Sequence, residues 1–383
     1  MSFPVVMPSN DATPPNPLGS FGLPAHLTAN TVDVSVVVPA YNAQATLSKT
    51  IYSIWAQTLQ PREIIIVNDG SSDHTAAVAQ ALTQFDSRIR VISQANAGVA
   101  IARQTGFDAS TGTFVAFLDS DDLWMPRFIE ASLQAVARAS QPECIVFSRY
   151  YAVDEAGYFM LESPRFDFAG PSVEGLIANA SVILPSTAFL HRAVVEDVGG
   201  FSPFHLYYHE DRIFFIKAFS QFPAYATGET LTVYQQSRQG KARRKMVEYD
   251  QMVHINDKMI AACGIFLTPN QKRLLALTEN RTLLYSFATY GFMDNARRLL
   301  REGFTPEERP VLTQGVKGRL LALSLLTGVN WLILGRQGVQ WFWRTVGHTW
   351  WQCQRLPLLP VLQMPIPSIQ QAAVAVPDTV PVS

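Results

Sequence analysis

The feature that most constrains the fold of this chain is a repeated alternation of short β-branched runs with segments of helical periodicity. The run Val34-Ser-Val-Val-Val38 is short and apolar enough to be a buried strand, and Pro39 ends it. In the next segment Leu47, Ile51 and Ile54 share one helical face. Further strand-like runs, separated by helical segments, occupy residues 63–67, 89–92 and 113–118. This order predicts an α/β fold with a doubly wound, mostly parallel sheet.

Polar residues follow three of the predicted strands. Residues 39–42 follow the first strand, Asp69 and Gly70 follow the second, and residues 119–122 follow the fourth. Ligands of such sheets bind beyond the carboxyl ends of the strands, so we expect these three sets to converge on one site.

The acidic segment Asp119-Ser-Asp-Asp122 is the most informative of the three sets. Residues two apart in an extended segment point the same way, so Asp119 and Asp121 can face one ligand while Ser120 turns aside. Carboxylates combined with substrate phosphates are the usual ligands of Mg²⁺, and Mn²⁺ takes similar oxygen ligands. An acidic turn that caps a helix starting near Pro126 is the alternative, and these residues alone leave both open.

Four motifs follow one another along the first third of the chain. They are Val36-Val-Val-Pro-Ala-Tyr-Asn42, Ile66-Val-Asn-Asp-Gly-Ser-Ser-Asp73, Asn96-Ala-Gly98 with Ala102-Arg103 and Gly106, and Phe117-Leu-Asp-Ser-Asp-Asp122. In this order they resemble glycosyltransferase family 2, a large inverting family with the GT-A fold. The resemblance runs from about Val34 to about Tyr234 and implies a GT-A, Rossmann-like, mostly parallel sheet flanked by helices, here with a C-terminal helical extension.

The resemblance also implies roles for individual residues. Asp69 would accept a hydrogen bond from the nucleotide base, Asp119 would contact the ribose, and Asp121 would bind a divalent metal, Mn or Mg. Arg103 would lie near the base or ribose. The alternatives are a plain tight turn for Asp69 with Gly70 and a solvated helix face for Arg103. The nucleotide-sugar-binding set predicted in this way is Pro39, Ala40, Tyr41, Asn42, Asp69, Gly70, Arg103, Asp119 and Ser120.

The acceptor half of the resemblance is carried by His209-Glu-Asp211, which follows Leu184-Pro-Ser-Thr-Ala-Phe-Leu190 and Val198-Gly-Gly-Phe201. Inverting transfer needs a carboxylate that takes the proton of the attacking hydroxyl. Asp211 matches the family's catalytic base, and Glu210 would hold an acceptor hydroxyl or orient the site. The alternative is that both acidic residues simply favour the helix macrodipole.

The sequence departs from the family pattern at several positions. Ile213 and Lys217 stand where the family often has a second aspartate and an arginine, so we expect different acceptor contacts. Tyr234-Gln-Gln-Ser237 replaces a Tyr-Arg-x-His pattern, which removes a candidate metal or phosphate ligand. The Arg- and Lys-rich residues 238–245 would either cover the diphosphate as a mobile basic loop or form a solvated charge run.

Composition and pattern divide the chain into four predicted parts. Residues 1–31 form a proline-rich, disordered leader, 32–245 the catalytic domain, 246–356 a helical region and 357–383 a proline-rich tail. An uncharged, mostly apolar run at residues 320–335 is followed by several tryptophans among arginines. This mixture predicts either a peripheral contact with a membrane surface or a helical cap packed on the catalytic domain.

Charge and cysteine content exclude other classes of protein. The 30 Lys and Arg residues balance 31 Asp and Glu residues, giving a net charge of -1, so no global attraction to nucleic acid is expected. The three cysteines form no CxxC pair, which argues against a disulfide framework and a structural zinc site. The first residues show no secretory signal, so we expect a cytoplasmic protein, with a peripheral position on the inner face of the membrane as an option.

Together these features predict an enzyme that moves a hexose-type sugar from a nucleotide diphosphate donor to a hydroxyl acceptor. We expect a UDP-sugar, with a thymidine diphosphate sugar as the alternative, and a glycan or lipid-linked acceptor in cell-surface polysaccharide synthesis. Two other functions stay open: a catalytically silent nucleotide-sugar binding module, and a sugar-nucleotide transferase of the pyrophosphorylase type. A transferase of the pyrophosphorylase type needs a Gly-rich phosphate loop after the first strand, and this chain has residues 39–42 there instead.

Overall fold

The structure, a computed structural model, describes residues 31–309 apart from 155–158, 164–169, 171, 179–182, 202–209, 237–248, 290–291 and 307. The strands are β1 Thr31–Ala40, β2 Gln60–Asp69, β3 Ile89–Gln94, β4 Phe114–Phe117, β5 Leu123–Trp124, β6 Ile145–Asp154, β7 Phe159–Glu162, β8 Ala188–His191 and β9 Ala224–Gln236. The helices are α2 Leu47–Trp55, α3 Thr75–Leu82, α4 Val99–Ala109, α5 Phe128–Arg138, α6 Val173–Ala178, α7 Arg192–Val198, α8 Glu210–Gln221, α10 Tyr249–Gly264, α11 Pro269–Thr289 and α12 Met293–Glu302, with the short 3₁₀ turn η1 Pro185–Thr187.

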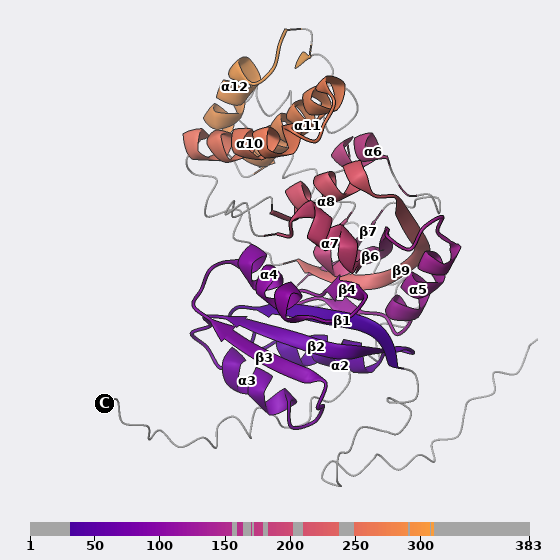
Figure 1. The fold of residues 1–383 in the computed structure, drawn as a ribbon. Helices are drawn as coiled ribbons and strands as arrows, with labels where there is room; N and C mark the ends of the chain where they lie inside the picture. Colours follow the sequence, from indigo (N-terminus) through magenta and orange to yellow (C-terminus); the bar gives the residue numbers. More distant parts are fainter. Residues whose placement is uncertain are drawn as a thin grey trace, which may run out of the picture.

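The described strands form one sheet in the order β3-β2-β1-β4-β8-β6-β9-β5, with β7 paired to β6 (Figure 1). Strands β3, β2, β1 and β4 run parallel, as the alternation of strands and helices predicts. Strand β8 runs antiparallel to both β4 and β6, so the sheet as a whole is mixed. The predicted α/β class of fold with C-terminal helices is confirmed. The expectation of a mostly parallel sheet holds for β1 to β4 and for the pair of β6 and β9, whereas the remaining pairings are antiparallel.

The two faces of the sheet are covered by different helices because alternate residues of β1 point to opposite sides. Val34, Val36 and Val38 pack with α2, α3 and α5 in one core, whereas Val37 packs with α4, α7 and α8 in the other. Helix α4 approaches the sheet closely at Gly106, where a Cβ atom would lie 2.3 Å from Val37 Cγ1. Only glycine fits there, which accounts for the glycine in the third sequence motif.

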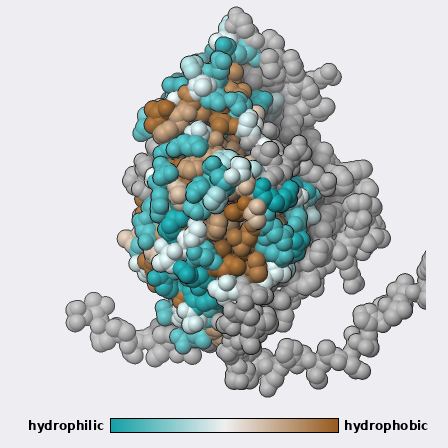
Figure 2. Space-filling view, turned by 45° about the vertical axis from the view of Figure 1, so that its right-hand side comes forward, coloured by the Kyte–Doolittle hydropathy of each residue, from teal (hydrophilic) through white to brown (hydrophobic). Residues whose placement is uncertain are grey.

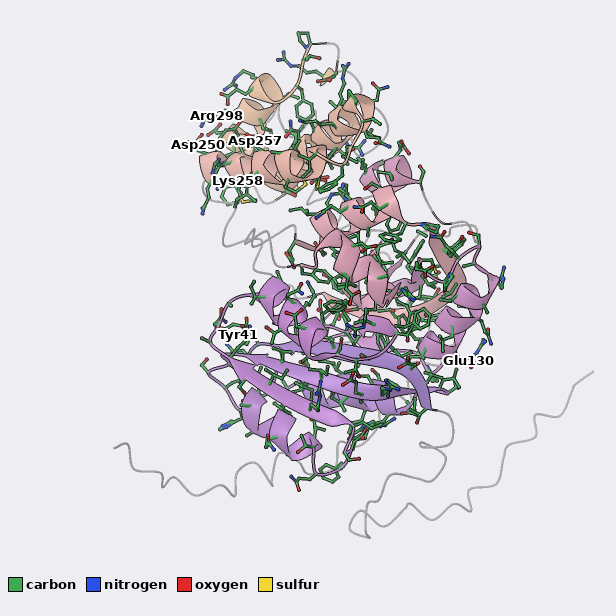
Figure 3. All side chains as sticks on the ribbon, in the orientation of Figure 1. Tyr41, Glu130, Asp250, Asp257, Lys258 and Arg298 are labelled. Atoms are coloured by element: carbon green, nitrogen blue, oxygen red, sulfur yellow. The ribbon has the colours of Figure 1, made fainter. Side chains whose placement is uncertain are left out.

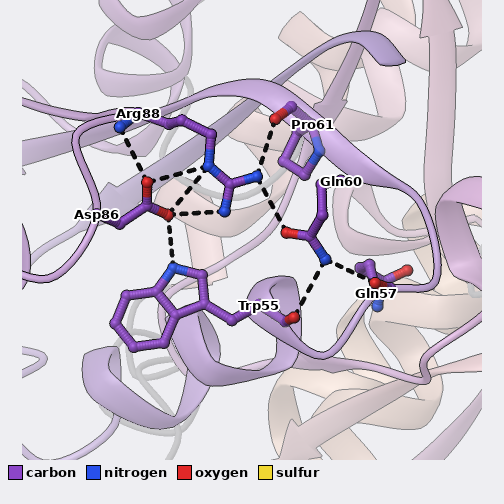
Figure 4. A network of polar contacts seen from close by, with 6 residues as sticks. All are labelled: Trp55, Gln57, Gln60, Pro61, Asp86 and Arg88. Atoms are coloured by element: carbon purple, nitrogen blue, oxygen red, sulfur yellow. Dashed lines mark hydrogen bonds and ion pairs between the residues drawn. The ribbon is translucent and has the colours of Figure 1, made fainter. Parts of the chain in front are cut away.

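A polar network fixes the sheet at the ends opposite the carboxyl termini of the parallel strands (Figure 4). Asp86 is buried and accepts hydrogen bonds from Trp55 Nε1 at 2.7 Å and Arg88 Nη2 at 2.8 Å. Burial opposes ionisation of Asp86, but the hydrogen bonds and charge of Arg88 outweigh it and lower the pKa of this carboxyl. Arg88 also donates to Gln60 Oε1 at 3.0 Å, so the network ties the end of α2 to the starts of β2 and β3.

Helices α10, α11 and α12 form a layer of their own beside α6 and α8 (Figure 1). They enclose a small core that includes Leu284, Phe287 and Leu299. Met259 and Cys263 from α10, with Leu275 from α11, are fully buried in the core beneath α8, so the layer packs directly on the part of the chain that contains the sheet.

Charged side chains lie along one side of the helical layer. Figure 3 shows Asp250, Asp257, Lys258 and Arg298 there, far from Tyr41 on the sheet layer, and Arg298 Nη2 pairs with Asp250 Oδ1 at 3.0 Å. Hydrophobic areas interrupt the hydrophilic surface on the face in Figure 2.

None of the described helices combines the length and the apolar character needed to cross a membrane. The predicted tryptophan-rich segment and the predicted basic loop lie outside the described residues.

Candidate active site

Two loops at the carboxyl ends of β1 and β2 are joined by side-chain hydrogen bonds. Asn42 has a left-handed backbone, with φ at 51°, a conformation that Asn tolerates better than most residues. Its backbone N–H donates to Ser71 Oγ at 3.0 Å, and its side-chain Oδ1 accepts from the backbone N–H of Ser72 at 2.9 Å. Pro39 and Ala40 are buried at the end of β1, and Tyr41 is 45% exposed at the surface. The predicted base loop is therefore held rigidly, with the Tyr41 ring at its outer side.

Asp69 holds the segment that leads into α4. Its carboxylate accepts from Gln94 Nε2 at 2.8 Å and from the backbone N–H groups of Ala97 and Gly98, both at 2.9 Å. Gly70 has a φ of 65°, and a Cβ atom there would lie 2.6 Å from the backbone nitrogen of Asn96. The turn at Asp69 and Gly70 thus orders residues 94–98, a partnership that the sequence did not reveal.

Arg103 joins two parts of the site that lie far apart in the sequence. Its side chain is 3% exposed, so a solvated helix face is excluded. Nη2 donates to both carboxylate oxygens of Asp119, at 2.8 and 3.0 Å, and Nη1 donates to Glu210 Oε1 at 3.1 Å. One guanidinium therefore brings the acidic loop after β4 next to the acidic pair at the start of α8.

The three aspartates of residues 119–122 lie in different environments. Asp121 is exposed, Asp119 and Ser120 are partly exposed, and Asp122 is buried. Burial raises the pKa of Asp122 well above its usual value, and the neighbouring charges of Asp121 and Asp119 raise it further. Asp122 accepts hydrogen bonds from Ser186 Oγ and from the backbone N–H of Gln235, so its role is to join this loop to η1 and β9.

The helix-capping alternative for the acidic segment is not supported. The two-residue strand β5 follows the segment, and α5 then begins at Phe128 with Arg127 as its N-cap and no side-chain capping bond. Asp119 and Asp121, the more exposed carboxylates, offer the hard oxygen ligands that Mg²⁺ or Mn²⁺ prefers. Among the residues that the structure describes, no group of three or more His, Cys, Asp or Glu side chains is arranged to hold a metal. The residues fit an ion that is completed by substrate phosphates and water.

The acidic pair stands at the first turn of α8, a helix that packs against α6, α7 and α10. Glu210 is 11% exposed, and Asp211 is partly buried. Burial raises the pKa of Asp211, while the positive charge of Arg103 acts in the opposite direction. Burial and the charge of Asp211 likewise raise the pKa of Glu210. A carboxylate with a raised pKa is a stronger proton acceptor, as a general base requires.

The Gly-Gly-Phe turn before α8 depends on a contact that the sequence did not indicate. Gly200 has a φ of 70°, and a Cβ atom there would lie 1.9 Å from Gln104 Oε1. That same oxygen accepts a hydrogen bond from the backbone N–H of Phe201 at 2.9 Å. Gln104 is next to Arg103 on α4, so the helix that carries the bridging arginine also fixes this turn.

Residues 35–199 match the model of the family "Glycosyl transferase family 2". These residues form a glycosyltransferase family 2 domain. The resemblance to this family is thereby confirmed. In chain order, the family 2 domain runs from β1 to α7 and includes the strands β1 to β8. The acidic pair on α8 lies just beyond the matched range.

Relatives of the family 2 domain occur in bacterial glycosyltransferases. Over 89 residues the chain is 46% identical to the uncharacterized glycosyltransferase EpsJ of Bacillus subtilis (strain 168), covering 23% of this chain and 26% of EpsJ. It is 38% identical over 108 residues to TuaG of the same organism, a glycosyltransferase named for teichuronic acid biosynthesis, covering 28% of this chain and 43% of TuaG. The chain thus spans less than half the length of these relatives.

Solved structures extend the likeness beyond the family 2 domain. The crystal structure of S. aureus TarS residues 1–349 in complex with UDP-GlcNAc superimposes with a TM-score of 0.57 at 17% identity. The match covers 80% of this chain and 92% of that chain. At this identity the comparison establishes the GT-A fold alone.

Proposed function

We propose that the chain is an inverting glycosyltransferase that moves a hexose-type sugar from a UDP-sugar to a hydroxyl of a glycan or glycolipid. The observation that carries the proposal is the double contact of Arg103 with Asp119 and Glu210. It places the carboxylates that would face the donor beside a carboxylate pair whose raised pKa suits proton abstraction. The named role of TuaG and the UDP-GlcNAc complex of TarS support a UDP-sugar and a surface polysaccharide.

In this proposal each side of the site has its own task. The loop of Pro39, Ala40, Tyr41 and Asn42, together with Asp69, Gly70 and Arg103, surrounds the nucleoside. Asp119 and Ser120 face the ribose. Asp121 would hold Mn²⁺ or Mg²⁺. A bound divalent ion neutralises the charge that develops on the leaving diphosphate.

The acceptor reacts on the opposite side of the sugar. Asp211 takes the proton from the acceptor hydroxyl as its oxygen attacks the anomeric carbon, and Glu210, held by Arg103, orients that hydroxyl. Burial favours the base because it raises the affinity of the Asp211 carboxylate for a proton. We place this reaction at the cytoplasmic side of the membrane, where a lipid-linked acceptor is accessible.

The test is a transfer assay that follows UDP release from a panel of UDP-sugars with Mn²⁺ and lipid-linked or oligosaccharide acceptors. We expect release that depends on both the metal and the acceptor. Donor binding without any turnover across the panel would instead support a silent nucleotide-sugar binding module. Equal affinity for adenosine and uridine diphosphates in calorimetry would contradict a pyrimidine-selective pocket.

A further inference from the structure

A buried ion pair joins the helical C-terminal layer to the first turn of α8. Arg212 Nε pairs with Glu279 Oε1 of α11, and the two side chains are only 8% and 3% exposed. Arg212 Nη2 also donates to the backbone oxygen of Ile177 on α6, at 2.9 Å. Three helices therefore meet at one guanidinium, and that guanidinium belongs to the residue directly after Asp211.

Packing alone does not account for these two charges. Met259, Cys263 and Leu275 already close the contact between the helical layer and the core beneath α8. A buried ion pair adds little net stability, because removing both charges from water offsets their attraction, whereas losing one partner leaves a costly buried charge. Such a pair is best suited to fixing one geometry.

We propose that Arg212 and Glu279 are positioning residues through which α11 sets the orientation and the charge environment of Asp211. The inference rests on the proposed function, in which Asp211 is the base. The backbone N–H of Arg212 donates to Asp211 Oδ1 at 2.7 Å, so a shift of the Arg212 backbone moves the carboxylate with it. The helical layer is then a working part of the active site.

The charges around Asp211 predict the direction in which its pKa should change in each variant. Arg103 from α4 and Arg212 stabilise the ionised carboxylate, whereas Asp119 from the loop after β4 opposes it. The charge of Asp211 raises the pKa of Glu210, which precedes it on α8. Glu279 acts through Arg212, because its negative charge offsets that of the guanidinium. Removal of Arg212 should raise the pKa of Asp211, and removal of Glu279 should lower it.

The experiment measures the pH dependence of kcat/KM for the full chain and for Arg212→Met, Glu279→Gln and the double variant. The base must be ionised, so we expect the acidic limb to move to higher pH in Arg212→Met and to lower pH in Glu279→Gln, each by about 0.5–1 unit. We expect kcat to fall roughly 10-fold to 10²-fold while the KM for donor changes by less than about threefold. Arg212→Lys, which keeps the charge, should restore the limb toward its original position.

Gln271→Ala is the matched control. It removes an exposed hydrogen bond between α11 and α6, from Gln271 Nε2 to Glu174 Oε1, without touching Arg212, and should leave the profile unchanged. If the acidic limbs of the Arg212→Met and Glu279→Gln profiles do not move in opposite directions, the ion pair of Arg212 and Glu279 is merely structural. If the single variants fail to fold, the double variant decides, because it buries no lone charge: an unchanged kcat overturns the proposal, and a lowered kcat with an unchanged KM supports it. Absence of transfer by the unaltered chain would contradict the proposed function instead.

Discussion

The carboxylates of the candidate site differ in their surroundings, and the surroundings decide what each can do. Asp122 is buried and bonded to Ser186 Oγ and the Gln235 backbone, so it holds the loop together. Asp121, two residues after Asp119, is exposed and accessible to a bound ion. Asp211 is partly buried with a raised pKa, which suits proton transfer. Variants of these residues should therefore fail in different ways.

Replacement of Asp211 by Asn removes the proposed base and nearly preserves the shape of the side chain. We expect transfer to fall by about 10²-fold or more, while the dissociation constant for the donor stays within a few fold. Steady-state kinetics with the acceptor, combined with calorimetry of donor binding, measures both quantities. Near-normal transfer by this variant would move the role of base to Glu210.

Asp121→Ala should lose the metal dependence of donor binding together with transfer. In the proposed function the ion offsets the charge of the leaving diphosphate, so its loss should weaken donor binding and slow transfer. The measurement is a titration of UDP with and without Mn²⁺, and we expect the metal-dependent tightening to disappear. Asp257→Ala, an exposed carboxylate on α10, is the control and should bind like the unaltered chain. Persistent metal-dependent binding by Asp121→Ala would show that the ion is held elsewhere.

At the scale of elements, the Gly-Gly-Phe turn offers a paired comparison. Gly199 and Gly200 both have positive φ, 80° and 70°, but a Cβ atom at Gly199 would meet open space and one at Gly200 would meet Gln104. Gly199→Ala should lower the free energy of unfolding by about 1–2 kcal/mol, the cost of a left-handed Ala. Gly200→Ala should cost roughly 1–2 kcal/mol more, because the Gln104 hydrogen bond to Phe201 is also lost.

Urea denaturation measures both values, and the difference isolates the contact with α4. Gln104→Ala combined with Gly200→Ala should bring the cost of the Gly200 change close to that of Gly199→Ala. Equal costs for the two glycines in the presence of Gln104 would show that the contact contributes nothing.

The elements themselves could be predicted from local pattern. Strands β1 to β4 were expected near their observed positions because β-branched runs and proline or glycine boundaries are local signals. The motif order likewise predicted that polar loops follow β1, β2 and β4. The positions of the later strands in the sheet could not be predicted from the sequence, since the antiparallel placement of β8 between β4 and β6 depends on long-range pairing.

The partners within the site could not be predicted in the same way. Asp122 bonds to Ser186, 64 residues away, and Arg103 bonds to Glu210, 107 residues away. Nothing in the immediate sequence of Arg103 distinguishes a buried bridge from a surface arginine, because its burial is decided by the docking of α8. The roles of the site residues in binding and catalysis stay predictions.

At the scale of the whole molecule, the helical layer and the family 2 domain share one core. Leu275 of α11 is fully buried in that core, whereas Ile265, just after α10, is 76% exposed. Leu275→Ala should therefore lower the free energy of unfolding by about 2–4 kcal/mol. Ile265→Ala should change it by less than about 0.5 kcal/mol.

Thermal and urea unfolding followed by fluorescence and circular dichroism checks this prediction. We expect one transition that coincides for both probes and moves as a whole in Leu275→Ala. A separate early transition of the helices, with the rest unchanged, would mean that the layer folds independently of the family 2 domain.

The single guanidinium of Arg103 has a consequence for the order in which substrates bind. It contacts Asp119 on one side and Glu210 on the other, at 2.8 and 3.1 Å. In the proposed function a ribose that engaged Asp119 would change the contacts of Arg103, and the position of Glu210, which would orient the acceptor, would be fixed only afterwards. Initial-rate kinetics should accordingly show a compulsory sequence, with donor first and acceptor second. UDP should then inhibit competitively against the donor and non-competitively against the acceptor. Random entry of the two substrates would also give competitive inhibition by UDP against the donor. It would differ by a measurable affinity of the donor-free chain for the acceptor.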